Sequence, residues 1–464
     1  MPLLFHAFSI AKHWYVFDAN KNSIISVNED QHNALSEIEQ GIETRENLSI
    51  LHEFQEKGFC REAIIESIYN PNTDLIGAHL EKKIQNVIIQ VTQGCNLRCA
   101  YCAYSGRYQN RTHSPKRMSF ETAKRAIDMA LSHSEDTQFI IFSFYGGEPL
   151  LELPLIKRCV KYIKQQAPNR DIIFSMTTNG TLLTPDVYGY LSDNGFNIVI
   201  SLDGPKQIHD MSRKYPDGRG SYDIIMENIK AIKSQYPESR DKLRFNAVLS
   251  PEIDDSCLPT LFKSDDVLSY YNHTANSVSD AYTEEHTSYS DAFSLCYDRE
   301  LCKLLLFKLG KLEKEHVSVL FGIREADIRR EYGRLKKIPR ISPICHPGGP
   351  CLAGAMRLFV NVDGKLFPCE RVSENSQLMA IGDLDNGFDI EKVQTVMNPG
   401  QVTDEQCKKC WVINHCSLCA AFSDDLTGLS QKVRLSNCPK SRSRYEETLK
   451  TICFLKEAGY DFEN

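Results

Sequence analysis

Three cysteines stand close together in the first quarter of the chain, with a spacing that suits an iron–sulfur cluster. Cys95, Cys99 and Cys102 form the pattern C-x3-C-x2-C, and Tyr101 stands directly before the last thiol. A [4Fe–4S] cluster normally takes four cysteine ligands, so three thiolates leave one iron open. An open iron can bind a substrate or a cofactor and act on it. The pattern therefore predicts a site of chemistry rather than a structural metal site.

Two simpler explanations of these thiols fit the sequence less well. A structural zinc site takes four ligands and usually uses paired C-x2-C units. Free cysteines are also often buried as small apolar residues. Neither explanation accounts for a polar, aromatic-containing loop that directly follows the apolar run 87–92. The cysteine spacing favours the cluster.

A second group of cysteines lies near the end of the chain and is large enough for two four-thiolate sites. Its C-x2-C pairs are also what zinc ribbons use, so spacing alone leaves zinc and iron–sulfur open. The first cysteine motif shifts the interpretation toward further iron–sulfur clusters. The eight members are Cys345, Cys351, Cys369, Cys407, Cys410, Cys416, Cys419 and Cys438.

Between about residues 85 and 250 the sequence alternates between apolar strand candidates and helical candidates. This alternation predicts a parallel sheet covered by helices on its outer face. Because such crossovers are right-handed, we expect an α/β fold with a partial (β/α)6 barrel of the TIM type. Sites in such barrels lie at the carboxyl ends of the strands. The predicted strands are 87–92, 139–144, 172–177, 197–202 and 243–249.

A glycine pair follows the second predicted strand in the run Gly146-Gly147-Glu148-Pro149. Paired glycines let the backbone approach a ligand closely, and a glutamate can accept an ammonium group. Alone, this run is an ordinary turn. At the same strand end as the three-cysteine loop, it is typical of an amino-acid binding site.

Polar residues also follow the next two predicted strands. Asn179 follows one of them, and Ser201 and Asp203 follow the other, with Arg213 ten residues later. Groups at successive strand ends face one cavity in a barrel, and an arginine can pair bidentately with a carboxylate. Each of these endings is also an ordinary turn when taken singly.

The remaining segments form separate units. The pattern of residues 1–80 predicts a small domain. We expect strands at 14–18 and 23–27, a helix around Leu35 and a second helical stretch over 62–69. Further along the chain we expect a helical bridge over 251–344, a cysteine-rich domain over 345–440 and a C-terminal helix over 441–464.

Composition narrows the setting in which the protein works. The chain has 464 residues and a net charge of -7, which argues against a nucleic-acid partner. It contains no apolar run of 18 residues or more, so we expect no membrane span. Seventeen cysteines without a secretory signal predict thiolate ligands in a reducing cytoplasm.

Together these motifs resemble the radical S-adenosylmethionine (radical SAM) family with a C-terminal SPASM domain. The resemblance covers about residues 85–250 and 345–440. Within that family, the flanks of Cys102 and Cys369 look most like peptide maturases, which modify ribosomally made precursor peptides (RiPPs), here a cysteine-rich one. Residues 1–80 are similar to the small winged-helix-like domains that grip the leader of such a peptide.

The resemblance implies a set of cofactor contacts. S-adenosylmethionine would chelate the open iron, and its one-electron cleavage would give a 5′-deoxyadenosyl radical that abstracts hydrogen from the peptide. Gly147 and Glu148 would hold the amine, Ser201 and Arg213 the carboxylate, and Tyr101 would contact the adenine. The same resemblance adds Gly146, Pro149, Asn179 and Asp203 to the cofactor site.

The resemblance also implies two auxiliary [4Fe–4S] clusters with interleaved ligands, hence three clusters in all. The nearer would use Cys345, Cys351, Cys369 and Cys419, and the farther would use Cys407, Cys410, Cys416 and Cys438. The Cys416-x2-Cys419 interval is one residue shorter than usual for the family. In some thioether-forming relatives the substrate thiolate takes a ligand position, and Cys345 is available here to close it.

The leading functional hypothesis is an intramolecular thioether synthase that receives electrons from a flavodoxin- or ferredoxin-type reductant. An anaerobic sulfatase-maturing enzyme is an alternative, with Glu370 in the place of the family's aspartate base. Peptide epimerisation and carbon–carbon crosslinking are further enzymatic outcomes. A zinc-stabilised peptide-binding protein is the non-enzymatic alternative.

Overall fold

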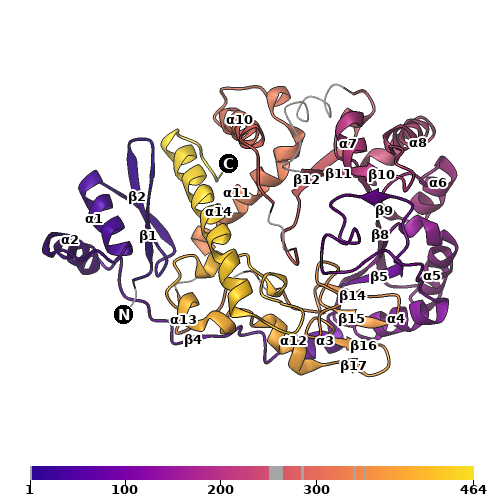
Figure 1. Cartoon of the computed structure of the whole chain (residues 1–464), viewed down its shortest axis with the longest axis horizontal. Helices are drawn as coiled ribbons and strands as arrows, with labels where there is room; N and C mark the ends of the chain where they lie inside the picture. Colours follow the sequence, from indigo (N-terminus) through magenta and orange to yellow (C-terminus); the bar gives the residue numbers. More distant parts are fainter. Residues whose placement is uncertain are drawn as a thin grey trace.

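The computed structural model describes residues 3–249, 265–283, 287–337, 341–347, 349 and 351–463. A small N-terminal lobe lies at one end and an α/β barrel at the other (Figure 1). The cysteine-rich region and the long helix α14 (Gln431–Glu457) lie between these two parts.

Six parallel strands build the barrel in the order β5-β7-β8-β9-β11-β12. This confirms the expected partial (β/α)6 architecture, and the five strands predicted from apolar runs all form. The sixth strand, β12, comes from the segment that we expected to be a helical bridge. The strands are β5 (Asn86–Thr92), β7 (Phe139–Gly146), β8 (Asp171–Thr178), β9 (Phe196–Ser201), β11 (Leu243–Leu249) and β12 (Asn272–Ser277).

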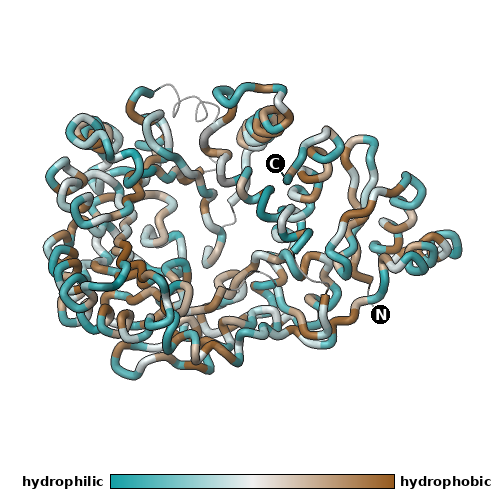
Figure 2. The backbone as a smooth tube through the Cα atoms, turned by 180° about the vertical axis from the view of Figure 1, so that it is seen from behind, coloured by the Kyte–Doolittle hydropathy of each residue, from teal (hydrophilic) through white to brown (hydrophobic). Residues whose placement is uncertain are grey.

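Helices cover the outer face of the barrel and leave its inner face partly open. Along β7, Phe142 and Phe144 are buried against the helices, whereas Ser143 and Tyr145 are only half-buried. Figure 2 shows the outer helices alternating between polar and apolar residues along their turns, as expected for helices with one buried face. These helices are α4 (Phe120–Ser132), α5 (Leu153–Gln166), α6 (Pro185–Asp193), α7 (Lys206–Ser212) and α8 (Tyr222–Gln235).

The cysteine-rich region continues the barrel sheet. Its strand β14 (Leu358–Val360) pairs in parallel with β5, and three short strands extend the sheet to ten. The strand that leads into the three-cysteine loop is therefore hydrogen-bonded to the cysteine-rich region. The other elements of this region are β15 (Lys365–Phe367), β16 (Gly382–Asp383), β17 (Gly387–Phe388), α12 (Ile390–Met397) and α13 (Asp404–Cys407).

The N-terminal lobe is a three-stranded antiparallel sheet with two helices. The strands at 14–18 and 23–27 form as predicted, and an additional strand precedes them. The first helix begins with a capping box in which Asn28 and Gln31 exchange side-chain and backbone hydrogen bonds. The elements are β1 (Phe5–Ile10), β2 (His13–Asp18), β3 (Ser23–Val27), α1 (Glu29–Glu39) and α2 (Arg45–Glu56).

The helix predicted over 62–69 is wrong, because this segment is extended. Ala63 and Ile65 are buried while Ile64 between them is 53% exposed, which is the two-residue period of a strand. The segment ends in β4 (Ser67–Ile68), which pairs with β13 (Ile344–Cys345), and α3 (Ile76–Lys82) then leads into the barrel. Pairing with a strand 277 positions away (from 67 to 344) carries no local signal.

Two further helices, α10 (Asp291–Lys308) and α11 (Gly322–Lys337), supply the helical part of the expected bridge. α11 contacts α14, which begins at Gln431 and so carries Cys438 on the helix that we expected to start at 441. In the described part of the chain, no helix is both long enough and apolar enough to cross a membrane.

Candidate active site

The three-cysteine loop follows β5 and brings its thiols together at the carboxyl end of the barrel strands. The backbone N–H of Leu97 donates to Cys95 Sγ at 3.3 Å, and the N–H of Tyr104 donates to Cys102 Sγ at 3.5 Å. Burial raises the pKa of Cys95 to about 12 and that of Cys99 to about 11. A bound metal deprotonates such thiols outright, and N–H donors to sulfur stabilise the resulting thiolates. The donor set therefore fits a cluster with three protein ligands.

The glycine pair after β7 lies directly against this loop. The N–H of Gly147 donates to the Thr92 carbonyl at 3.1 Å, and the N–H of Glu148 donates to the Gly94 carbonyl at 2.9 Å. A methyl group at position 147 would overlap the Gly94 carbonyl oxygen and lie 3.0 Å from the Cβ of Cys95. Glycine is required here because two backbone segments touch.

The Glu148 carboxylate joins the ends of neighbouring strands. It is fully buried and accepts hydrogen bonds from Thr178 Oγ1 at 2.7 Å, Asn179 N at 2.8 Å and Leu150 N at 3.0 Å. Burial raises its pKa to about 6 against the opposing effect of these donors. The side chain expected to hold an ammonium group thus has its oxygens engaged inside the protein. Pro149 begins the short 3-10 helix that follows.

Asn179 connects the end of β8 to the cysteine loop. Its Nδ2 donates to Asn96 Oδ1 at 2.8 Å and lies 3.9 Å from Cys95 Sγ. Its Oδ1 accepts from the backbone and hydroxyl of Thr181. These bonds fix the loop against the barrel, so Asn179 helps to position the thiols.

Asp203 and Arg213 form a buried bidentate ion pair beside Cys99. Arg213 Nε and Nη2 donate to the two Asp203 oxygens at 2.8 and 3.1 Å, and the hydroxyl of Tyr101 donates to the same carboxylate. Burial acts to raise the pKa of Asp203, and Arg213 outweighs burial and lowers it. Asp203 therefore accepts hydrogen bonds from two of the Arg213 nitrogens and from the Tyr101 hydroxyl. We expected both side chains to contact the cofactor. Ser201 is the last residue of β9.

A buried polar network, which the sequence did not reveal, links the three-cysteine loop to the cysteine-rich region. Gln90 Nε2 donates to Tyr104 at 2.8 Å and to Glu374 at 2.7 Å. Arg111 pairs with Glu374 at 3.3 Å and donates to the carbonyl of Glu370 at 2.9 Å. Arg111, the last of the first three residues in chain order, is 259 positions before Glu370, so no spacing signal marks the network.

Three of the C-terminal thiols gather beside the barrel and form the near site, which we define as Cys351, Cys369 and Cys419. Burial raises the pKa of Cys369 to about 12, and Glu370 and the two other thiols add to it. Both Cys369 and Cys419 pack against the apolar core of the barrel.

Cys345, expected as the fourth ligand of the near site, lies in a different core. It is buried with Trp411 and Cys407, and its Sγ donates to Asn414 Oδ1 at 3.2 Å. Burial raises its pKa to about 11, and Cys407 is the neighbouring thiol that contributes. The structure therefore separates Cys345 from the near site.

Glu370 lies directly after Cys369 and has one free carboxylate oxygen. Arg357 Nη1 donates to Oε1 at 2.9 Å. Oε2 is buried and has no hydrogen-bond partner among the described residues. An acceptor in this state can take a proton from a bound group.

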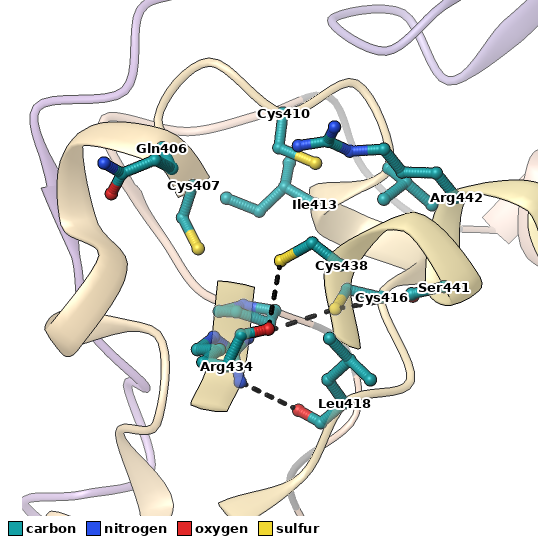
Figure 3. A pocket seen from close by; sticks show the side chains of 12 residues that line it. Gln406, Cys407, Cys410, Ile413, Cys416, Leu418, Arg434, Cys438, Ser441 and Arg442 are labelled. Atoms are coloured by element: carbon teal, nitrogen blue, oxygen red, sulfur yellow. Dashed lines mark hydrogen bonds between the residues drawn. The ribbon is translucent and has the colours of Figure 1, made fainter. Parts of the chain in front are cut away.

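Four other thiols form the far site, which we define as Cys407, Cys410, Cys416 and Cys438. They line one pocket and point into it (Figure 3). Arg434 and Arg442 line the same pocket. Four convergent thiols with adjacent positive charge fit a [4Fe–4S] cluster, which carries net negative charge. The two arginines stand four residues on either side of Cys438, so helical spacing was the signal that could have revealed them.

Comparisons with known proteins agree with this geometry. Residues 89–264 match the Radical SAM superfamily. The chain is 32% identical over 168 residues to a cysteine-type anaerobic sulfatase-maturating enzyme of Clostridium novyi, which covers 36% of the chain and 43% of that protein. It is 27% identical over 342 residues to such an enzyme of Clostridium perfringens, which covers 70% of the chain and 85% of that protein.

Further similarities reach across most of the chain. The radical SAM cyclopropyl synthase TigE of Paramaledivibacter caminithermalis is 23% identical over 81% of the chain and 77% of its own length. The solved structure of native anSMEcpe with bound AdoMet and Kp18Cys peptide covers 80% of the chain and 99% of its own, with a TM-score of 0.58 and 21% identity. At 21% identity, this similarity supports the assignment of the fold alone.

Fold, cysteine loop and comparisons define this chain as a radical SAM enzyme. It is related to the anaerobic sulfatase-maturating enzymes and carries a C-terminal cysteine-rich region. This class implies S-adenosylmethionine and a radical-forming [4Fe–4S] cluster, for which Cys95, Cys99 and Cys102 are the fitting ligands. A zinc-stabilised binding protein without radical chemistry does not account for the match.

Proposed function

We propose that this enzyme forms intramolecular thioether bonds between cysteine sulfurs and carbon atoms of a cysteine-rich precursor peptide. The proposal places the radical at the Cys95 loop and the substrate thiol at the near site. Residues 1–80 would hold the leader of the peptide, and a flavodoxin- or ferredoxin-type protein in the cytoplasm would supply electrons.

The observation that carries the proposal is the composition of the near site. Cys351, Cys369 and Cys419 lie together, whereas Cys345 packs in a separate core beside Cys407. Because a [4Fe–4S] cluster has four ligand positions, three thiols would leave one position for a thiolate of the substrate. A peptide cysteine held there would be activated and fixed in position.

The residues of the chain supply positioning and one proton acceptor. Thioether formation removes a hydrogen atom from carbon, a proton from the thiol and one electron. When bound, S-adenosylmethionine and the clusters supply the oxidising chemistry, taking the hydrogen atom and the electron. Glu370 Oε2 accepts the thiol proton, and the Arg357 hydrogen bond to Oε1 keeps the carboxylate beside Cys369.

The barrel holds the reacting groups in a fixed relation. β14 pairs with β5, so the cysteine-rich region is hydrogen-bonded to the strand that carries the radical loop. The Gln90, Glu374 and Arg111 network adds buried bonds across the same junction. Fixed geometry of this kind lets the radical be aimed at one carbon of the peptide.

The test is mass spectrometry of a cysteine-rich precursor peptide co-expressed anaerobically with the enzyme. We expect the peptide to lose two hydrogens for each link, and the linked cysteine to resist alkylation. A C95A variant, which lacks a ligand of the radical loop, is the matched control. A peptide of unchanged mass with fully alkylatable cysteines would contradict the proposal.

A second candidate is oxidation of a protein cysteine or serine to formylglycine. It is supported by the relatives named above and by the carboxylate that follows Cys369. The product would carry an aldehyde that reacts with hydrazines and would contain no crosslink. Peptide epimerisation or carbon–carbon crosslinking would leave every cysteine alkylatable, and epimerisation would add only solvent deuterium.

A further inference from the structure

We propose that Arg434 and Arg442 make the far site the more easily reduced of the two auxiliary sites. The inference rests on the [4Fe–4S] clusters of the proposed function. It assigns the far site the role of electron acceptor. An electron that leaves the peptide at the near site would pass to the far site, because the far site has the higher midpoint potential.

The guanidinium group of Arg434 is buried and lies against the far site. It is 1% exposed and is the bulkiest of the fully buried side chains in the described residues. Its Nη1 donates to the Leu418 carbonyl at 3.3 Å and to Ser423 Oγ at 3.1 Å. Its Nη2 lies 4.0 Å from Cys416 Sγ, so the positive charge directly faces a thiol (Figure 3).

Arg434 also acts on a second thiol through Thr403. Its Nε donates to Thr403 Oγ1 at 3.1 Å, and that hydroxyl lies 3.2 Å from Cys407 Sγ. The same hydroxyl donates to the Gly400 carbonyl at 3.2 Å, so Thr403 joins the arginine to the backbone beside Cys407. Hydrogen bonds to cluster sulfurs favour the reduced, more negative state.

Arg442 approaches the far site from the exposed side of α14. Its guanidinium lies beside Cys410 (Figure 3), where burial raises the pKa of the thiol to about 11 and the arginine opposes that rise. Ser441, on the same turn, donates to Cys416 Sγ at 3.7 Å. Cys410 and Cys416 therefore each have a side-chain donor, and the Thr403 hydroxyl lies beside Cys407.

Neither arginine has a carboxylate partner among the described residues, and of the two only Arg434 is buried, whereas the buried Arg111 and Arg213 are both paired. Burying a guanidinium without a counter-charge is strongly unfavourable. A [4Fe–4S] cluster with four thiolates carries about two negative charges in its oxidised state. Two arginines around four thiols match that charge.

The near site differs from the far site because a carboxylate lies among its charged neighbours. A carboxylate, Glu370, lies beside Cys369 and acts to raise its pKa. Of the two arginines there, Arg357 pairs with this carboxylate at 2.9 Å, and Arg371 is 76% exposed and therefore screened by water. A neighbouring anion disfavours adding an electron, whereas the buried guanidinium of Arg434 favours it. The difference between the two sites sets the direction of electron flow from near to far.

The experiment is a redox titration of the anaerobically reconstituted full-length protein, followed by electron paramagnetic resonance. The far signal is identified as the one lost in a C407A/C410A double variant. We expect the far site of the unmodified protein to have the higher midpoint potential. R434Q should reduce its equilibrium constant for reduction tenfold or more, about 59 mV for one electron. R442Q should change it in the same direction by a smaller factor, because Arg442 is exposed.

The control is R444Q, on the same helix, because Arg444 is exposed and pairs with Asp327 at 3.4 Å away from the thiols. It should leave all potentials unchanged, and the near-site potential should stay constant in every variant. R442Q keeps the test decisive if R434Q does not fold. An unchanged far-site potential in R442Q, or a near site that is reduced first, would overturn the inference.

Failure of the proposed function gives a different result. If the far site holds no [4Fe–4S] cluster, the iron content of the C407A/C410A variant equals that of the unmodified protein, and the inference fails together with the cluster assignment. If both clusters are present but no thioether forms, the potentials still decide the role of the arginines.

Discussion

The imidazole of His6 stacks on the indole of Trp411 with ring centroids 4.1 Å apart and planes 5° from parallel. His6 lies on β1 of the N-terminal lobe, and Trp411 directly follows the far-site ligand candidate Cys410. The imidazole also lies between two carboxylates, with Nδ1 2.7 Å from Glu39 and Nε2 3.1 Å from Glu446. The N-terminal lobe is thus joined to the far site by a residue that can carry charge.

This contact predicts a pH-dependent docking of the lobe. Burial acts to lower the pKa of His6, but Glu39 and Glu446 outweigh it and raise the pKa. The stabilisation is therefore fully present below the unfolded value of about 6.5 and is lost as the pH rises through the higher folded pKa. We expect protection of the β1 amides from hydrogen exchange to fall as the pH rises above about 6.5, by about 1 kcal/mol or less.

In H6Q this pH dependence should disappear. His52 offers a matched control, because it is 71% exposed and pairs only with Glu56 on its own helix. H52Q should keep the dependence of the unmodified protein. Equal slopes in H6Q and the unmodified protein would show that another group titrates.

Gly147→Ala should remove the radical cluster while leaving the two auxiliary sites loaded. A methyl group there meets the Gly94 carbonyl and the Cβ of Cys95, so the cysteine loop must shift. We expect loss of the radical-loop cluster signal and at least a hundredfold fall in 5′-deoxyadenosine formation, as for other misplaced catalytic groups. Gly77→Ala, where no atom lies within 4 Å of the added methyl, should behave like the unmodified protein.

Asp203→Asn should destabilise the fold strongly, because it leaves Arg213 as an unpaired buried charge. The expected loss in the free energy of unfolding is about 3–5 kcal/mol. The pKa of Asp203 is lowered, so its stabilisation is present above the unfolded carboxyl value of about 3.9 and is lost as the pH falls through the folded pKa.

Asp217→Asn is the surface comparison, because the Asp217 and Arg219 pair at 2.8 Å is solvent-exposed. Urea unfolding at neutral pH should show a change of about 1 kcal/mol or less for this variant. Similar losses for the two variants would mean that the buried pair does not stabilise the cysteine loop.

Cys345→Ala should keep both auxiliary clusters, because Cys345 packs beside Cys407 and Asn414 rather than with the near thiols. Cys351→Ala should instead lose one cluster, about four irons per chain. Iron content and resonance spectra of the two variants decide the matter. Loss of four irons in Cys345→Ala would show that this residue closes the near site and would remove the open position for a substrate thiol.

Glu370→Gln should uncouple cofactor cleavage from peptide modification. The amide keeps a hydrogen-bonding group beside Arg357 but cannot take up a proton at the position of Oε2. We expect crosslinking to fall by about 10²–10⁴-fold, the usual contribution of a general base. 5′-Deoxyadenosine should still form, and Glu370→Asp should recover part of the crosslinking. Full crosslinking in Glu370→Gln would assign the proton to another acceptor.

Local patterns in the sequence were sufficient for much of the barrel. Apolar runs such as 87–92 and 197–202 identify its strands, because a strand buried on both faces reads as a continuous apolar run. The sixth strand was missed because β12 reads Asn-His-Thr-Ala-Asn-Ser, which is polar and lies at the edge of the sheet. The extended segment at 62–69 was missed because its partner strand is far away in the chain.

The sequence by itself determined the chemistry, because residue type and spacing define which groups can bind iron. The loop of Cys95, Cys99 and Cys102 and the C-x2-C pairs are local, so their thiols must lie near one another wherever the chain goes. Tertiary structure alone decided how distant groups combine. It placed Cys345 apart from Cys351, turned Glu148 inward and set Arg434 against the far thiols. The physical reason is that burial and charge pairing depend on contacts between residues that lie far apart in the chain.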